Sequence, residues 1–181
     1  DPLNPRTIGD GAVRAIVQDR QGDLWIGSEA SGLSRLDTDT GQIERFQGGL
    51  GESGLSDNSI RDLMIGPDGI LFVATFNGGL WQVDTQTLKF QRTPLVSASG
   101  NPVVRTRSLL ADREGRIWVG SDEGVFLIDP IAETVSNFSH QPTDVASLSN
   151  NIVLDLVEDR GGVVWVATYD GISKWDSAAP A

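Results

Sequence analysis

The strongest constraint on this chain of 181 residues is a repeat that occurs four times in one register. Its clearest marker is a glycine, at positions 22, 69, 115 and 162, which gives intervals of 47, 46 and 47 residues. An aromatic residue stands three positions after each of these glycines. A second glycine and an aspartate follow at nearly constant spacing, as at Gly32 and Asp37 of the first copy. One small structural unit is therefore built four times.

Each copy has the features of a short antiparallel sheet. An aspartate (Gly66 in the second copy) stands three residues before the marker glycine, which is typical of a tight turn closed by a residue with positive φ. A wholly apolar strand follows, such as residues 24–26, and a strand without polar alternation is covered on both faces. Two more polar strands and a loop rich in Ser, Gly and Asn complete the copy. The repeat therefore predicts an all-β fold of four-stranded antiparallel β-propeller blades.

We treat the chain as a single propeller segment with blades at residues 12–58, 59–104, 105–151 and 152–181. The fourth copy stops after its third strand, at Asp176, so its outer strand is either missing or supplied by residues 1–7. Propellers usually have more than four blades, and we therefore expect a partial propeller. Its end blades would expose apolar faces, so the expected protein partners are a second copy, giving a homodimer, or the remaining blades of a parent propeller.

The sequence resembles the two-component regulator propeller repeat. The resemblance is carried by residues 13–28 (VRAIVQDRQGDLWIGS), by residues 32–37 (GLSRLD), and by the linking phrases GLSDN at 54–58 and SLSNN at 147–151. It spans essentially residues 8–176. It is weaker in the second copy, where Gly66 replaces the turn aspartate and Phe72 the tryptophan, and in the third, which has GNP at 100–102 instead of the linking phrase.

This resemblance implies a location and a role. Such repeats form the periplasmic or otherwise extracytoplasmic sensor region of bacterial hybrid histidine kinases and diguanylate cyclases, and saccharides are frequent ligands of that family. The chain would then be part of an input domain for signal transduction. Kinase or cyclase activity of a parent protein would lie outside it.

Composition excludes several classes of function. The chain has 14 Lys and Arg against 25 Asp and Glu, a net charge of −11, which disfavours nucleic acid and anionic membrane surfaces as partners. Its apolar runs are too short to cross a membrane, and no signal segment opens it, so we interpret it as a mature protein or an excised segment. With no cysteine and a single histidine, His140, we expect no metal site, no cofactor and no catalytic residue.

Two local motifs favour structural interpretations. Residues 49–54 (GLGESG) match a dinucleotide-binding pattern, but no helix is expected after them, so we interpret them as an inter-blade loop. Residues 37–41 (DTDTG) faintly resemble a calcium loop, but the equivalent segments keep only the first aspartate. We therefore expect a turn in which Asp37 accepts hydrogen bonds from its own backbone.

The candidate ligand-binding residues are those that break the repeat, because the fold alone does not require them. They lie between the second and third strands of each copy: Glu29, Phe76, Asn77, Asp122, Glu123, Tyr169 and Asp170. Aromatic rings beside carboxylates and amides suit sugars, whose C–H faces stack while their hydroxyls form hydrogen bonds. We therefore expect a non-enzymatic segment that binds a saccharide-type small molecule or oligosaccharide at its loop face. A propeller lyase or glycan-processing enzyme that uses loop carboxylates, and a protein-binding scaffold, are the alternatives.

Overall fold

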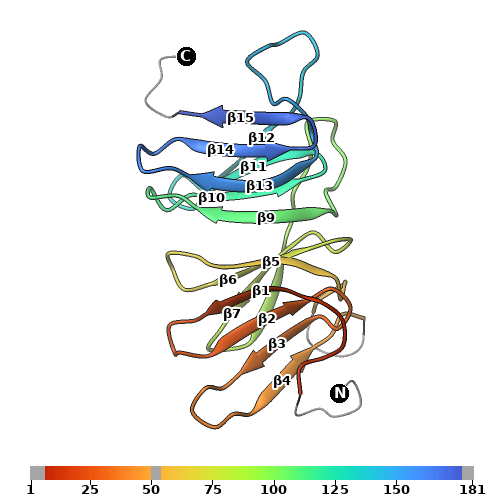
Figure 1. Cartoon of the computed structure of the whole chain (residues 1–181), viewed down its shortest axis with the longest axis vertical. Coiled ribbons are helices and arrows are strands. Elements are labelled where there is room, and N and C mark those ends of the chain that lie inside the picture. Colours follow the sequence, from red (N-terminus) through yellow and green to blue (C-terminus); the bar gives the residue numbers. More distant parts are fainter. Residues whose placement is uncertain (1–6, 50–53, 177–181) are drawn as a thin grey trace. The chain divides into compact units, whose positions relative to one another are not determined.

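The described part of the chain folds into four antiparallel β-sheets, each made of strands that are consecutive in the sequence (Figure 1). The computed structural model describes residues 7–49 and 54–176, and every regular element within these residues is a β-strand. In the same residues there is accordingly no helix with the length and hydropathy needed to span a membrane. The predicted all-β fold of propeller blades is confirmed.

Within the described residues, three of the sheets have four strands and the last has three. The first consists of β1 (Val13–Gln18), β2 (Leu24–Ser28), β3 (Leu33–Leu36) and β4 (Ile43–Phe46). The second consists of β5 (Ile60–Ile65), β6 (Leu71–Thr75), β7 (Leu80–Asp84) and β8 (Lys89–Thr93). The third consists of β9 (Thr106–Ala111), β10 (Ile117–Ser121), β11 (Gly124–Asp129) and β12 (Thr134–Phe138). The fourth consists of β13 (Val153–Glu158), β14 (Val164–Thr168) and β15 (Gly171–Trp175).

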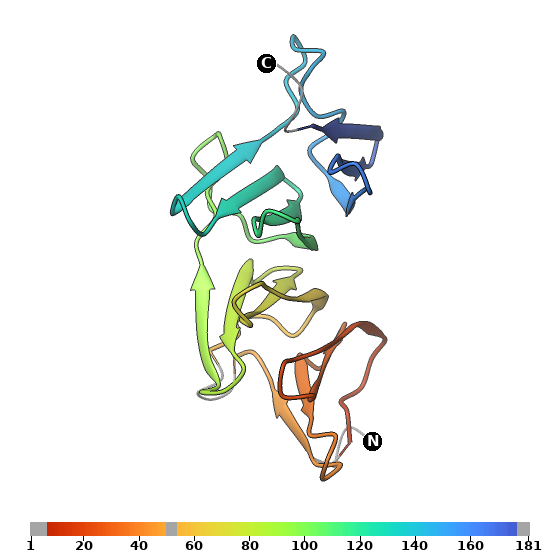
Figure 2. The ribbon, with the colours of Figure 1, turned by 90° about the vertical axis from the view of Figure 1, so that its left-hand side faces the viewer.

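The chain divides into two compact units, Asp1–Pro94 and Leu95–Ala181, and each contains two blades. Figure 2 shows the two sheets of each unit from the side. In each unit the core lies between the sheets, around Trp25 of β2 in the first and Trp118 of β10 in the second. Both indoles are at most 1% exposed. Each fully buried side chain of this size stabilises the fold by about 1.5–3 kcal/mol.

The buried tryptophans are fixed by the aspartate that opens the preceding turn. In the first blade one oxygen of Asp19 accepts the indole N–H of Trp25 at 2.8 Å, and the other accepts the amides of two turn residues at 3.0 Å each. Asp112 and Asp159 bind Trp118 and Trp165 in the same way, again at 2.8 Å. One carboxylate thus joins the turn to the core side chain of the middle strand.

The second blade replaces both members of this pair. A ring without an N–H group, Phe72, stands in the tryptophan position, and Gly66 stands in the aspartate position. A Cβ atom at Gly66 would lie 2.8 Å from the Phe72 ring, so the glycine leaves room for it. An aspartate there would bring a carboxylate against a ring that cannot donate a hydrogen bond to it.

The turns between the third and fourth strands follow the expected pattern. Asp37 accepts the amides of Asp39 and Thr40 at 3.0 and 2.8 Å, and Asp84 and Asp129 bind the equivalent amides in their own blades. The interpretation of residues 37–41 as a self-bonded turn is therefore confirmed.

Two predicted features fall partly outside the described residues. Of the segment 1–7, only Thr7 is described, and its carbonyl accepts a hydrogen bond from Arg45 of β4 at 2.6 Å. Residues 1–6 lie outside the described residues, and so do residues 50–53 of the glycine-rich motif. The assignment of residues 1–7 to the fourth blade therefore stays a prediction.

The aspartate–tryptophan pair predicts a specific pattern of mutational coupling. We expect Trp25→Phe to lower the free energy of unfolding by about 1–3 kcal/mol, because the buried Asp19 carboxylate loses its indole donor. Asp19→Gly combined with Trp25→Phe reproduces the pair found in the second blade, and it should cost less than the sum of the single changes. Urea denaturation of the four proteins measures this coupling, and strictly additive costs would contradict it. In the half-buried pair, Trp165→Phe serves as a control and should cost less.

The carboxyl groups of the turns also predict acid sensitivity. The Thr40 amide and hydroxyl lower the pKa of Asp37, and the Trp165 indole and Val163 amide lower that of Asp159. Burial raises the pKa of Asp112, but hydrogen bonds from Trp118 and Arg116 outweigh it, so the net direction is also downward. A carboxyl whose pKa is lower in the folded than in the unfolded state stabilises the fold above its unfolded pKa, and this stabilisation is lost as the pH falls through the folded value.

We therefore expect the free energy of unfolding to decrease as the pH falls below about 4, the ordinary pKa of an aspartate. Urea denaturation at a series of pH values between neutrality and this acid range measures the effect. The decrease should be smaller in Asp112→Asn, which removes one of the contributing carboxyls. Stability that is constant or rises in acid would contradict this account.

Candidate functional site

The innermost strand of every blade contains a bulge at the same position. The register between first and second strands shifts after the first residue pair, which leaves one residue without a partner: Arg14, Arg61, Arg107 or Leu154. A bulge bends its strand and changes the direction of a side chain. Here it lies at the end of the sheet that carries the loops between second and third strands, where the candidate residues were predicted.

In the first unit the bulged arginines join the candidate residues of two blades. Arg14 binds Glu29 of its own blade at 2.7 Å, and Arg61 of the next blade approaches the same carboxylate at 3.9 Å. The Arg61 guanidinium also lies 4.3 Å from the centre of the Phe76 ring, within cation–π range. Glu29 and Phe76 are therefore brought together by Arg61, and we call residues 14, 29, 61 and 76 the rim cluster.

In the second unit, the side chains at the bulged end are charged in the third blade and apolar in the fourth. Asp122 pairs with the bulged Arg107 and, at 3.5 Å, with Arg105. In the fourth blade the two corresponding residues are Leu154 and Tyr169, whose side chains are 45% and 73% exposed. The loop side chain thus differs in each of the four blades, although the bulge behind it is constant.

The remaining candidate residues do not join these contacts. Asn77 is held through its backbone amide, which donates to Asp57 at 2.6 Å. Glu123 and Asp170 are held through backbone groups as well, the carbonyl of Glu123 by Asn137 and the amide of Asp170 by Thr168. Their assignment as ligand-binding residues stays a prediction.

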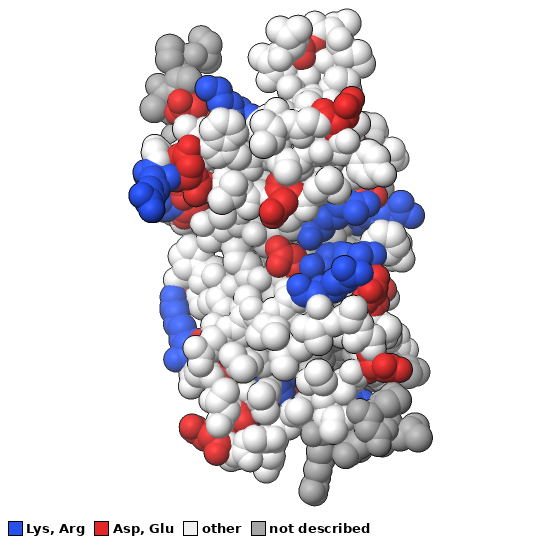
Figure 3. All heavy atoms as spheres, in the orientation of Figure 1, with Lys and Arg blue, Asp and Glu red and all other residues white. Residues whose placement is uncertain are grey.

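The sequence reasoning missed the arginines, although the repeat contains a signal for them. Arg14, Arg61 and Arg107 occupy the same position of three copies, directly after the first residue of the inner strand's bulged segment. A comparison of the four copies, position by position, shows an arginine at the second position of the first strand in three of them. Figure 3 shows basic and acidic groups lying beside one another on the face drawn.

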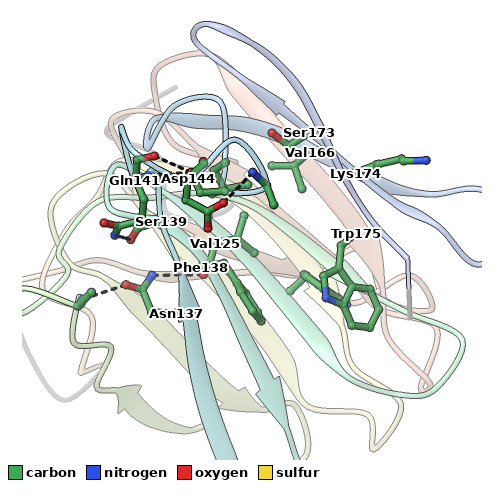
Figure 4. A pocket seen from close by; sticks show the side chains of 15 residues that line it. Val125, Asn137, Phe138, Ser139, Gln141, Asp144, Val166, Ser173, Lys174 and Trp175 are labelled. Atoms are coloured by element: carbon green, nitrogen blue, oxygen red, sulfur yellow. Dashed lines mark hydrogen bonds between the residues drawn. The ribbon is translucent and has the colours of Figure 1, made fainter. Parts of the chain in front are cut away.

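A second feature of the second unit, which the sequence did not reveal, is a cavity of about 380 Å³. It lies between β12, β15 and the loop of residues 139–151, and its size is within the usual range of small-molecule sites. Figure 4 shows the rings of Phe138 and Trp175 on one side and the loop residues Gln141 and Asp144 on the other, while the Lys174 amine points away.

His140, the single histidine of the sequence, has a structural role in this loop. Nδ1 of His140 lies 2.6 Å from the carbonyl oxygen of Leu148, and its backbone amide donates to Asn151, so the histidine holds the loop of residues 139–151 in place. Over residues 7–49 and 54–176 there is no cluster of three or more His, Cys, Asp or Glu side chains with the arrangement of a metal site.

Known structures share this fold. The extracellular domain of a hybrid two component system from B. thetaiotaomicron matches 97% of this chain and 22% of its own length at 24% identity, with a TM-score of 0.76. PorZ, a surface component of the type-IX secretion system of Porphyromonas gingivalis, matches 92% and 26% at 21% identity, with a TM-score of 0.65. The chain thus spans less than a third of either protein.

Virginiamycin B lyase from Staphylococcus aureus also shares the fold, with 14% identity over 98% of this chain and 58% of its own and a TM-score of 0.64. At these identities the likeness shows the fold alone. No curated protein sequence is significantly similar to the chain.

A family comparison gives the more specific result. The family described as "two component regulator propeller" matches residues 7–30, 98–123 and 147–170. These residues contain the first two strands, and the turn between them, of the first, third and fourth blades. The unmatched second blade is the one with Gly66 and Phe72 in place of aspartate and tryptophan. Segments of the first, third and fourth blades therefore match the two-component regulator propeller repeat.

Proposed function

We propose that this chain is a ligand-recognition segment of an extracytoplasmic bacterial signal-transduction sensor and that it acts without catalysing a reaction. The match to two-component regulator propeller repeats supports a sensor role. The shared fold with the extracellular domain of a hybrid two component system supports the extracytoplasmic location. The ligand in this proposal is a saccharide-type small molecule bound at the loop face.

The observation that carries the proposal is the bulged end of the inner strands, of which the rim cluster is the part in the first unit. A bulge repeated in every blade directs a side chain towards a loop whose own residue varies, from Glu29 through Phe76 and Asp122 to Tyr169. A feature that the fold needs is expected to repeat, and the variable residues are therefore free to serve recognition. Guanidinium groups donate and carboxylates accept hydrogen bonds, so together they match hydroxyl groups, which do both.

Energetics also argue against a purely structural role for these pairs. The side chains of Arg14 and Glu29 are 43% and 39% exposed, and an ion pair this accessible to water contributes about 0–1 kcal/mol to stability. The exposed ring of Tyr169 offers an apolar face without any gain to the core. Both arrangements present polar or aromatic groups to solvent, as a binding surface requires.

We expect a neutral oligosaccharide to bind the intact chain, and Glu29→Ala to weaken that binding about tenfold, because a hydrogen bond to a charged group is worth about 1.5–3 kcal/mol. Phe76→Ala should also weaken the binding, because the sugar loses the apolar face of the ring. Thermal-shift screening of an oligosaccharide panel, followed by isothermal titration calorimetry of the hits, measures the affinities. Tyr169→Ala tests the second unit in the same way, and its high exposure should leave stability unchanged.

The matched control is Asp39→Ala, which removes an exposed carboxylate from a turn at the opposite end of the strands. Its affinity should equal that of the unchanged protein. Equal losses in Asp39→Ala and Glu29→Ala would contradict the site. Turnover of a bound saccharide, monitored by product analysis during the titrations, would contradict the non-enzymatic role.

A further inference from the structure

The ion pairs at the bulged end differ between the blades in which member is exposed to solvent. In the first blade the side chains of Arg14 and Glu29 are 43% and 39% exposed, so solvent reaches donor and acceptor alike. In the third blade the side chain of Asp122 is only 17% exposed, whereas that of Arg105 is 51% exposed and that of Arg107 is 27% exposed. A ligand that approaches the third blade therefore meets two guanidinium groups before it meets their shared carboxylate.

Asp122 fixes the position of these two arginines. Its carboxylate pairs through one oxygen with Nε of Arg107 and through the other, at 3.5 Å, with Arg105. The backbone amide of Asp122 also donates to the carbonyl oxygen of Arg105 at 3.3 Å. The bulge between Thr106 and Ser108 leaves Arg107 outside the strand register. Backbone and carboxylate thus hold both guanidinium groups beside the loop between β10 and β11.

The Arg107 guanidinium keeps one edge unused. Within the described residues its side chain donates only through Nε, so neither terminal nitrogen has an acceptor. A guanidinium presents its donors as a planar fork that fits the two oxygens of a carboxylate. Glu123, the other acid of this loop, is exposed and forms no ion pair with Arg107 in the described part of the chain. The unused edge is therefore available to an acidic group of a ligand.

We propose that Arg105 and Arg107 bind the carboxylate of an acidic saccharide and that Asp122 is the positioning residue of this oxyanion site. The proposal rests on the proposed function, because it specifies which class of saccharide the segment recognises: one that contains a uronic acid. The first blade differs, since the accessible carboxylate of Glu29 suits hydroxyl groups, which can donate to it.

The net charge of −11 does not oppose a site of this kind. Nucleic acid and anionic membranes need cations over an extended surface, whereas a single carboxylate needs only one or two arginines. At physiological ionic strength, charges farther away than about 8 Å are largely screened. The ligand therefore responds mainly to the groups that it contacts, which are the two arginines.

The probes are trisaccharides of glucuronate, galacturonate and mannuronate, each used as the free acid and as its methyl ester, and glutarate as an acid that is not a sugar. Isothermal titration calorimetry with the full chain measures their affinities. We expect at least one free acid to bind about tenfold or more tighter than its own ester, because only the acid forms a charged hydrogen bond with the arginines. This preference should decrease at high salt concentration.

The outcomes separate this proposal from the proposed function. Esters that bind as tightly as the free acids would overturn the oxyanion site and leave the saccharide-binding role intact. If glutarate binds as tightly as the acids while no ester binds, the carboxylate site is supported and a saccharide as its ligand is overturned. No binding of any probe would overturn both.

Variants of one arginine locate the site. Arg107→Gln should abolish most of the preference for the acid, and Arg107→Lys, which keeps the charge but not the fork, should abolish part of it. The matched control is Arg160→Gln, which removes an exposed arginine from the turn at the opposite end of the strands in the same unit. It should leave the preference unchanged. Equal losses in Arg107→Gln and Arg160→Gln would reveal a general charge effect and overturn the site.

The positioning role of Asp122 is tested by the sign of an effect. Removing the carboxylate of Asp122 or of Glu123 makes the loop less negative, which by itself would tighten binding of an acid. We expect Asp122→Ala to weaken this binding severalfold instead, because the arginines lose the group that holds them, and Glu123→Ala not to weaken it. Melting temperatures check that both variants are folded. Tighter binding of the acid by Asp122→Ala would overturn the positioning role.

Discussion

The structure depends on one carboxylate that binds a turn and a core side chain together. Asp19 and Asp112 accept backbone amides of their turns with one oxygen and the indole N–H of a fully buried tryptophan with the other. These hydrogen bonds fix where the second strand of the blade begins and how its tryptophan packs in the core. The second blade shows that the two positions act as a pair, because its phenylalanine is accompanied by a glycine. The side chains of Arg20 and Arg113 donate hydrogen bonds to carbonyl groups in the turn of the following blade, and these bonds join adjacent sheets.

The bulge and the turns are common to the blades, whereas the side chains beside the bulge differ from blade to blade, and it is these side chains that indicate a function. The bulge of the inner strand recurs in all four blades, so it belongs to these common features. The groups it presents are an ion pair in the first and third blades, a cation–π contact in the second and exposed apolar side chains in the fourth. A surface with donors, acceptors and aromatic faces in fixed positions suits a polar ligand with apolar faces. The opposite ends of the blades carry turns that bind mainly themselves.

The fold could be predicted because the same residues recur in each copy of the repeat. The contacts at the bulged ends and the cavity were hard to predict because they involve residues that differ between copies. Glycine and aromatic spacing is sufficient to derive the strands, the turns and the self-bonded aspartates, because each depends on residues close in sequence. The variable loop positions Glu29 and Phe76 could also be found, since they break the repeat. The contact between them could not, because it runs through Arg61 of another strand and depends on a bulge that no composition reveals. The cavity beside β15 could not be predicted either, because its lining comes from several strands and from the loop of residues 139–151, which are distant from one another in the sequence.

We propose that ligand recognition takes place at the bulged end of the inner strands, apart from the cavity beside β15. Chemical-shift mapping by NMR of the full chain during titration with a bound oligosaccharide tests this directly, because it reports on every backbone amide at once. We expect the largest shift changes at residues 14, 29, 61 and 76 of the first unit, or at their counterparts 107, 122, 154 and 169 of the second. Changes confined to the turns at the opposite end of the strands, or to the loop of residues 139–151 around the cavity, would contradict it.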